Sequence, residues 1–423
     1  MRSCLCLKSV FTSLRAYVLV VPWLAIGAGV GYAAWRSPIA IVLVLALPLV
    51  MAYGRTRLDS FALMLGYFAV GSAQLPTVVH TFFGNGVPWI AYGMPALLAC
   101  LLAAPFLLVS PRSPPLRRAL WLLLALAILT LPPLGLLAWR DPLFAAGALF
   151  PNLGWGSVVA CALLFCALVA LRDARSAAGS GAALLRVVPV VLLLAVAGVC
   201  ISVPQNRGAW RTVDWIGTDT TFLPARTPAT QTARTRHIAS LIQQANTLPW
   251  LRVLVFPEAV IDPYRVVDEI DLFDASDEAA RLHKAIVFGA MLRVGRDGWR
   301  DVAMGAGTLA GPGGAPRVLT ESRVPMPVGN WHLGFPGGVP LHAFATDAGE
   351  INGVPVAWSI CYEDFLLWPH PSLLDGHADV LISMANDWST TGTRLARSQA
   401  ISVYLLSRMA GVPLVAAQNL SPR

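Results

Sequence analysis

The distribution of charge divides the chain into two parts before any motif is considered. Residues 1 to 203 contain thirteen Lys or Arg side chains but only three acids, whereas residues 204 to 423 contain eighteen bases and twenty acids. Long apolar stretches fill most of the first part, a composition far from that of an ordinary soluble protein. We therefore expect a membrane domain over residues 1 to 203 and a globular domain over residues 204 to 423.

Hydropathy predicts about seven transmembrane helices in the first part, most of them near the ~20 residues that cross a bilayer core. They cover residues 16–34, 39–53, 61–79, 87–109, 119–139, 154–171 and 187–203. Gly27 and Gly31 form a GxxxG pair, which we interpret as a helix-packing surface rather than a transport site.

The basic residues between these segments predict an orientation. Eleven Lys or Arg side chains fall on the side that holds the N-terminus and two fall on the other side. By the positive-inside rule, this bias places the N-terminus in the cytoplasm and, after an odd number of spans, the globular domain outside it. The predicted location is the bacterial inner membrane, with the globular domain in the periplasm.

Strand and helix patterns alternate after residue 203, which indicates an α/β layered domain. Predicted strands cover residues 251–256, 285–291, 354–360, 379–384 and 412–417, and predicted helices cover residues 227–246, 278–284 and 397–409. The Gly-rich residues 305–314 are expected to form a hairpin or loop.

Several function classes find no support in this domain. It has no net positive charge and no basic stripe, so nucleic acid is not an expected partner. Its histidines lack the HExxH or paired-Cys spacing of a metal site, and the chain has no GxSxG, Walker A or GxGxxG pattern. We therefore predict no metal and no cofactor.

Polar residues follow three of the predicted strands. Glu258 follows the first of them, Cys361 another, and Asn386 with Asp387 a third. Cys361 is the only cysteine after residue 203, and an inert core cysteine is the alternative interpretation. A thiol nucleophile needs a base and a group that stabilises an oxyanion. Glu258 is the candidate base.

The motifs around these residues resemble the carbon-nitrogen hydrolase (nitrilase) superfamily. They are Phe256-Pro257-Glu258-Ala259, Ile360-Cys361-Tyr362-Glu363 and Asn386-Asp387-Trp388. With the multi-span first part, the chain is similar to membrane-bound apolipoprotein N-acyltransferases and their relatives, which include the conjugal transfer TraB proteins. The resemblance implies a four-layer αββα sandwich, with Cys361 as the nucleophile and Glu258 as the general base.

The same resemblance suggests roles for residues near the thiol. Glu363 matches the acid that follows the family's cysteine, and the backbone N–H of Tyr362 could face an oxyanion. The family's third catalytic residue, a lysine, is absent from the corresponding region, where Arg323 is the nearest cation and our candidate for its electrostatic role. Lys284 lies elsewhere in the chain order and is expected at a surface helix end.

These features lead to two functional hypotheses. The first is thioester-mediated N-acyl transfer or amide hydrolysis on a membrane-associated substrate, such as a lipid or a lipid-linked amine or amide. The alternative is a catalytically degenerate nitrilase fold that serves as a structural component of a conjugation or envelope assembly. The missing lysine favours the alternative, and conjugation or envelope proteins are possible partners under either hypothesis.

Overall fold

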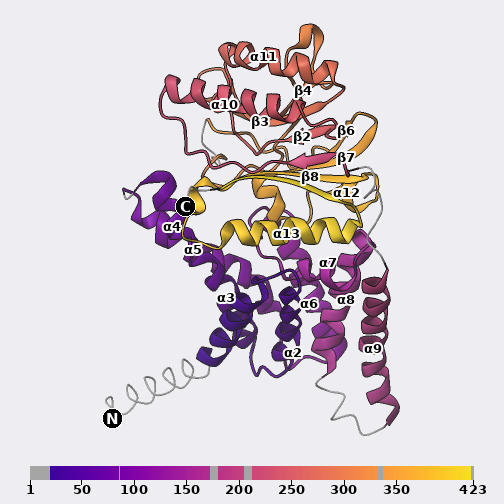
Figure 1. The fold of residues 1–423 in the computed structure, drawn as a ribbon. Coiled ribbons are helices and arrows are strands. Elements are labelled where there is room, and N and C mark those ends of the chain that lie inside the picture. Colours follow the sequence, from indigo (N-terminus) through magenta and orange to yellow (C-terminus); the bar gives the residue numbers. More distant parts are fainter. Residues whose placement is uncertain (1–19, 85, 172–179, 204–211, 332–336, 421–423) are drawn as a thin grey trace. The chain divides into compact units, whose positions relative to one another are not determined.

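The computed structural model describes residues 20–84, 86–171, 180–203, 212–331 and 337–420 (Figure 1). By their internal contacts the residues form two compact units. The first unit comprises residues 1–150 and 156–203, and the second comprises residues 151–155 and 204–423.

In its described part, the first unit contains only helices as regular elements. They are Val20–Ala34, η1 (Ala40–Leu45), α2 (Ala46–Ala52), α3 (Arg57–Ser72), α4 (Leu75–Phe83), α5 (Pro88–Ala103), η2 (Ala104–Leu108), α6 (Pro115–Thr130), η3 (Leu134–Leu136), η4 (Pro142–Phe144), α7 (Ala145–Leu149), α8 (Trp155–Ala170) and α9 (Ser180–Ser202). Two helical stretches, Arg57–Phe83 and Trp89–Leu108, are long and apolar enough to cross a membrane. They are weak evidence for membrane association, and the seven spans and their orientation stay predictions.

The GxxxG pair brings two helices of this unit together. A Cβ at Gly27 would lie 1.8 Å from the carbonyl oxygen of Leu63, and one at Gly31 would lie 2.6 Å from that of Tyr67. Both carbonyls belong to α3, so only glycines let the helix Val20–Ala34 approach its backbone this closely. The helix-packing interpretation of this pair is confirmed.

The second unit is a mixed α/β structure built on two sheets. The first sheet has the order β1 (Trp215–Gly217), β2 (Val253–Val255), β3 (Ala285–Val294), β4 (Gly298–Gly307) and β5 (Arg317–Glu321). Strands β1 to β3 are parallel, and β4 and β5 are antiparallel to their neighbours. The second sheet has the order β6 (Ala348–Ile351), β7 (Val354–Ile360), β8 (Val380–Asn386) and β9 (Leu414–Asn419), with β7 to β9 parallel.

Side chains from both sheets share one core, so the sheets pack face to face. This core joins Val255 and Val287 of the first sheet to Trp358 and Ile382 of the second. The other face of the first sheet packs against α10 (Pro228–Asn246) and α11 (Val266–Arg281) in a second core. Helix α13 (Leu395–Ala410) runs along the outer face of the second sheet, near the short helix α12 (Pro371–Leu374) (Figure 1).

All five strands predicted after residue 203 are present, four of them with shifted ends. β7 has the predicted bounds, and β2, β3, β8 and β9 overlap their predicted ranges. The hairpin expected over residues 305–314 is present, because β4 ends at Gly307 and pairs antiparallel with β5 after a connection. The helix expected over residues 278–284 instead begins at Val266 and ends at Arg281.

Candidate active site

Cys361 lies where strand β7 ends and the 3-10 helix η8 (Cys361–Phe365) begins. Its φ is +51°, a left-handed conformation that a non-glycine residue adopts only when its surroundings enforce it. Gln399 of α13 supplies one such restraint, because its Nε2 donates to the carbonyl oxygen of Cys361 at 2.9 Å. The thiol is half-buried, and this turn holds it at the end of the strand.

Glu258 comes from the facing sheet, three residues after the last residue of β2. Its neighbour Ala259 also has a positive φ, +47°. Strand β3 allows this segment to pack closely, because a Cβ at Gly289 would lie 2.5 Å from the Cα of Glu258. The Glu258 carboxyl is 4% exposed and hydrogen-bonds with the Cys361 thiol. The structure therefore brings together the two residues predicted to act as base and nucleophile, although they end strands of different sheets.

Asp301 of β4 is a third member of the site, which the sequence did not reveal. Its side chain is 1% exposed and adjoins the Glu258 carboxyl closely enough to share a proton with it. Among the described residues, no N–H group, hydroxyl or cation lies within hydrogen-bonding distance of either Asp301 oxygen. The only signal in the sequence is a lone acid directly before the apolar run Val302-Ala303-Met304.

The protonation of this group is set mainly by burial. Burial raises the pKa of the Glu258 carboxyl well above its ordinary value, and the negative charge of Asp301 raises it further. Burial likewise raises the pKa of Asp301 to about 7, although its hydrogen bond with Glu258 works in the opposite direction. Two carboxyls in contact cannot both ionise cheaply, so the pair tends to retain one proton near neutral pH.

The Cys361 thiol is also held in its neutral form. Burial raises its pKa well above the ordinary value, and the charges of Glu258 and Asp387 add to the effect. A hydrogen bond from the backbone of Asn386 lowers the same pKa, but it does not outweigh these causes. In this arrangement the thiolate forms only when a base removes the proton during reaction.

Asn386 and Asp387 are placed beside the thiol by the end of β8. The Asn386 side-chain oxygen accepts from Asn419 Nδ2 at 2.7 Å, and Asp387 accepts from Gln418 Nε2 at 2.6 Å. Burial raises the pKa of Asp387 to about 6 despite the Gln418 hydrogen bond. Both predicted residues therefore adjoin Cys361, one through its backbone and the other through its charge.

Arg323 is engaged by Glu363, and its proposed electrostatic role stays a prediction. Its guanidinium is 2% exposed and pairs with Glu363 at 2.5 Å, while also donating to the carbonyl oxygens of Trp358 and Pro369. Glu363 accepts further hydrogen bonds from the backbone N–H groups of Arg323 and Ile360. The structure thus brings the predicted residues Arg323 and Glu363 together as an ion pair, which holds the start of η8 in place.

The remaining predicted residue, Tyr362, is half-buried on η8, and its ring lies 6.1 Å from that of Phe365. Its oxyanion role stays a prediction.

Lys284 is not at the surface as expected, because its Nζ is buried against the last turn of α10. It donates there to the carbonyls of Ala245, Asn246 and Leu248 at 2.7, 2.9 and 2.7 Å.

A network of polar side chains supports the nucleophile from behind. Asp364 accepts hydrogen bonds from Ser359 at 2.5 Å, from Ser383 at 2.9 Å and from Gln399 at 3.0 Å. Gln399 therefore bonds both Asp364 and the Cys361 carbonyl, which ties η8 to α13. Such fully bonded buried networks hold one arrangement of the backbone.

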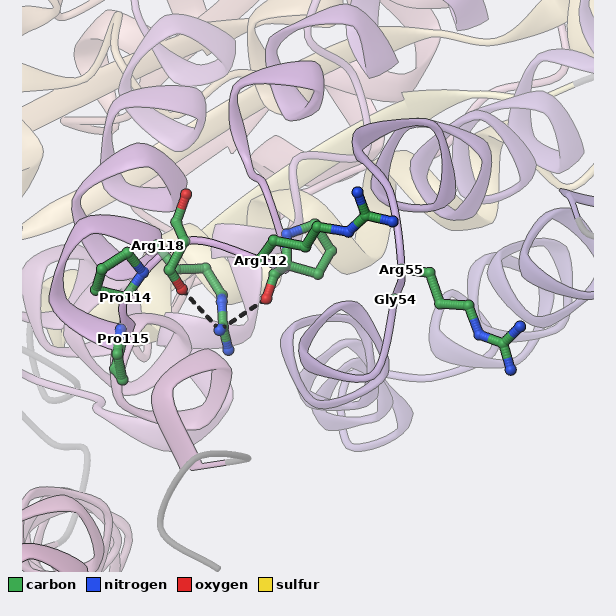
Figure 2. Close-up of a pocket in the computed structure, with 8 residues that line it drawn as sticks. Gly54, Arg55, Arg112, Pro114, Pro115 and Arg118 are labelled. Carbon is green, nitrogen blue, oxygen red and sulfur yellow. Dashed lines mark hydrogen bonds between the residues drawn. The ribbon is translucent and has the colours of Figure 1, made fainter. Parts of the chain in front are cut away.

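A separate pocket of about 580 Å³ lies in the helical unit (Figure 2). Its lining includes Arg55, Arg112 and Arg118, but no carboxylate, thiol or histidine. Arg118 is occupied by the carbonyl oxygens of Pro111 and Ser113, at 2.8 and 2.9 Å. The pocket contains none of the residues predicted to act chemically, so the group around Cys361 is the candidate active site.

Comparison with known proteins gives two relatives that span nearly the whole chain, while no protein-family model matches. The probable conjugal transfer protein TraB of Sinorhizobium fredii is 26% identical over 409 residues, which cover 92% of this chain and 95% of that protein. The conjugal transfer protein TraB of Agrobacterium fabrum is 27% identical over 445 residues, with 96% and 93% covered. This chain is a distant homologue of the TraB proteins. The TraB resemblance inferred from the motifs is thereby confirmed.

Solved structures of the nitrilase superfamily are also similar to about half of the chain. The C145A mutant of the Nesterenkonia AN1 amidase matches with a TM-score of 0.34 and 12% identity, over 49% of this chain and 75% of the amidase. A carbon-nitrogen hydrolase from Helicobacter pylori matches with a TM-score of 0.33 and 12% identity, over 47% of this chain and 71% of the hydrolase.

Proposed function

We propose that this chain is a membrane-anchored, TraB-type conjugal transfer protein whose α/β unit catalyses N-acyl transfer or amide hydrolysis through a thioester on Cys361. The observation that carries the proposal is the contact between Cys361 and Glu258. The two residues come from facing sheets, and a strained turn at each holds them together. An inert core cysteine needs no buried carboxyl against its thiol, because burying such a group has a cost.

The proposed reaction uses these two side chains in sequence. Glu258 accepts the thiol proton as the sulfur bonds to the carbonyl carbon of the substrate, whose oxygen becomes the oxyanion. The tetrahedral intermediate then breaks its C–N bond, and Glu258 returns the proton to the leaving amine. The resulting thioester transfers its acyl group to an amine or to water, which loses a proton to Glu258, and the thiol is restored.

The expected substrate is associated with the membrane. The apolar helices Arg57–Phe83 and Trp89–Leu108 support anchoring, and the positive-inside bias supports a cytoplasmic N-terminus with the α/β unit in the periplasm. A tethered enzyme of this kind favours a lipid or a lipid-linked amine or amide as its substrate. The two TraB relatives support conjugation proteins as partners.

Acylation of Cys361 tests the proposal directly. The full chain, purified in detergent, is incubated with p-nitrophenyl hexanoate, quenched in acid and digested, and the Cys361 peptide is weighed by mass spectrometry. We expect an acyl adduct on Cys361 that forms about 100-fold more slowly in Glu258→Gln, the size typical for loss of a general base. Glu350→Gln, which removes a carboxylate at an exposed position, serves as the matched control and keeps the wild-type rate.

Two outcomes would contradict catalysis at this site. One is the absence of any Cys361 adduct in protein whose unfolding transition is intact, and the other is an equal acylation rate in Glu258→Gln.

The structural alternative, a degenerate nitrilase fold in an envelope assembly, is favoured by one observation. No Lys or Arg side chain among the described residues pairs with Glu258, Asp301 or Cys361. A mating assay separates the two functions, because a structural component supports conjugation equally well when Cys361 is replaced by Ser. An enzyme loses transfer in that variant while its abundance in the membrane is unchanged.

A further inference from the structure

Asp301 has a buried carboxyl group whose surroundings do not satisfy it. Buried carboxyl oxygens in folded proteins are nearly always paired with a donor. Asp301 is 1% exposed, and among the described residues its oxygens have no N–H or cationic partner and share only the proton of the Glu258 carboxyl. It points toward Glu258, the residue that adjoins the Cys361 thiol. A buried acid that has one shared proton and no cation beside it, inside a reactive site, indicates that a ligand completes it.

The cations that could have satisfied Asp301 are bound elsewhere. Arg323 pairs with Glu363, and Lys284 donates to three carbonyls at the end of α10. The residue opposite Asp301 on the adjoining chain segment is Ser322, whose backbone N–H donates to the Asp301 carbonyl at 2.8 Å. Ser322 continues the pairing of Val302 with Glu321, so its Cβ lies on the same face as that of Asp301.

The charges around the thiol limit which ligand is suitable. Glu258, Asp301 and Asp387 all act on this site with the same sign, so an anionic ligand would be repelled. The described residues contain no group of three or more His, Cys, Asp or Glu side chains arranged to hold a metal ion. A primary ammonium fits better, because its three N–H donors can serve both Asp301 oxygens and Glu258 at once.

We propose that the site around Cys361 binds a primary ammonium group, held by Asp301 and Glu258, as part of the acyl acceptor or of the scissile substrate. This inference rests on the proposed function, since it assigns a substrate class to the same site. The ligand is an amine-bearing molecule whose positive charge supplies the cation that the protein itself does not place there.

Three methanethiosulfonate reagents that differ in charge test this assignment. Full-length protein in detergent is treated with 2-aminoethyl methanethiosulfonate, which carries an ammonium, with the neutral methyl methanethiosulfonate, and with the anionic 2-sulfonatoethyl methanethiosulfonate. Mass spectrometry of the Cys361 peptide gives each rate, which is divided by the rate of free cysteine with the same reagent. We expect the normalised rate to be about tenfold higher for the cationic reagent than for the neutral one, and lower again for the anionic one.

Two variants connect this preference to Asp301. In Asp301→Asn the cationic preference falls to about twofold or less, because one of the two attracting carboxylates is gone. Asp375→Asn removes the same charge at an exposed position and retains the preference. Ser322→Lys, which places an ammonium opposite Asp301, also removes the preference and does not depend on Asp301→Asn folding.

Each result has a distinct meaning. Equal normalised rates for all three reagents in folded wild-type protein would overturn the ammonium site and leave the proposed acylation intact. A preference that persists in both Asp301→Asn and Ser322→Lys would overturn it as well. If no reagent modifies Cys361, the nucleophile is unreachable, which overturns the proposed function and the ammonium site together.

Discussion

The burial of Asp301 beside Glu258 has a consequence for stability as well as for chemistry. The folded protein holds the pKa of Asp301 at about 7, compared with an ordinary value of 3.8, so between these values the folded state binds a proton that the unfolded state has released. Stability must therefore fall as the pH rises through this window. This contribution is fully present below about pH 4 and is lost above about pH 7.

Asp301→Asn tests this linkage, because an amide does not titrate. Thermal unfolding in detergent between pH 5 and pH 8, in steps of about half a unit, should show wild-type stability falling faster with pH than that of the variant. The difference between the two proteins in the slope of unfolding free energy against pH approaches ~1.4 kcal/mol per pH unit for one proton. Glu258 titrates with Asp301, so its contribution is included in the difference. Parallel curves for the two proteins would show that Asp301 is ionised throughout.

Individual residues differ in how far sequence could predict them. Cys361 and Glu258 stand in short motifs at strand ends, so their proximity could be anticipated. Asp301 has no motif, and its position depends on the pairing of β4 with β3 and β5, which no local pattern encodes. The guanidinium of Arg323 could be placed near the cysteine segment, but its pairing with Glu363 depends on how η8 turns.

At the level of elements, η8 is held by one buried ion pair. Glu363 accepts from the guanidinium of Arg323 and from three backbone N–H groups, those of Arg323, Val324 and Ile360. Replacing one partner of a buried pair leaves the other charge without compensation, which typically costs ~3–5 kcal/mol. We therefore expect Glu363→Gln to lower the midpoint of thermal unfolding strongly.

The same pair offers a test of the electrostatic role first considered for Arg323. Arg323→Lys retains the charge but loses the fork that reaches Trp358 and Pro369, so stability should fall. The preference of Cys361 for the cationic reagent should not change. A large change in acylation rate at unaltered stability would instead show that Arg323 acts on the reaction.

Strands were predictable where their own residue pattern favours the same structure as their pairing with neighbouring strands. β7 and β8 are largely buried apolar runs, and β9 begins with four apolar residues, which local patterns indicate well. β4 and β5 contain glycine, arginine and acidic residues, and they form strands because they pair with β3 and with each other. Pairing with the neighbouring strands overrides the weak local preference of these residues, so these strands could not be predicted from their own composition.

At the scale of the whole molecule, the fold of the α/β unit and the membrane location of the helical unit rest on different observations. The α/β unit is defined by its paired strands and shared cores. The predicted membrane location of the helical unit depends on charge bias and on the length of its apolar helices, two of which, within the described residues, are long enough to span a bilayer. Orientation in the membrane is therefore the prediction that most needs a direct measurement.

Reporter fusions determine this orientation. Alkaline phosphatase is active only outside the cytoplasm, so a fusion after Arg423 should be active if the chain crosses the membrane an odd number of times. A matched fusion at Arg55, in the segment between α2 and α3, should be inactive, because the arginines there belong to the side predicted to be cytoplasmic. Activity at Arg55 with none at Arg423 would invert the topology. The Cys361 site would then face the cytoplasm, and its amine-bearing substrate would have to be sought there.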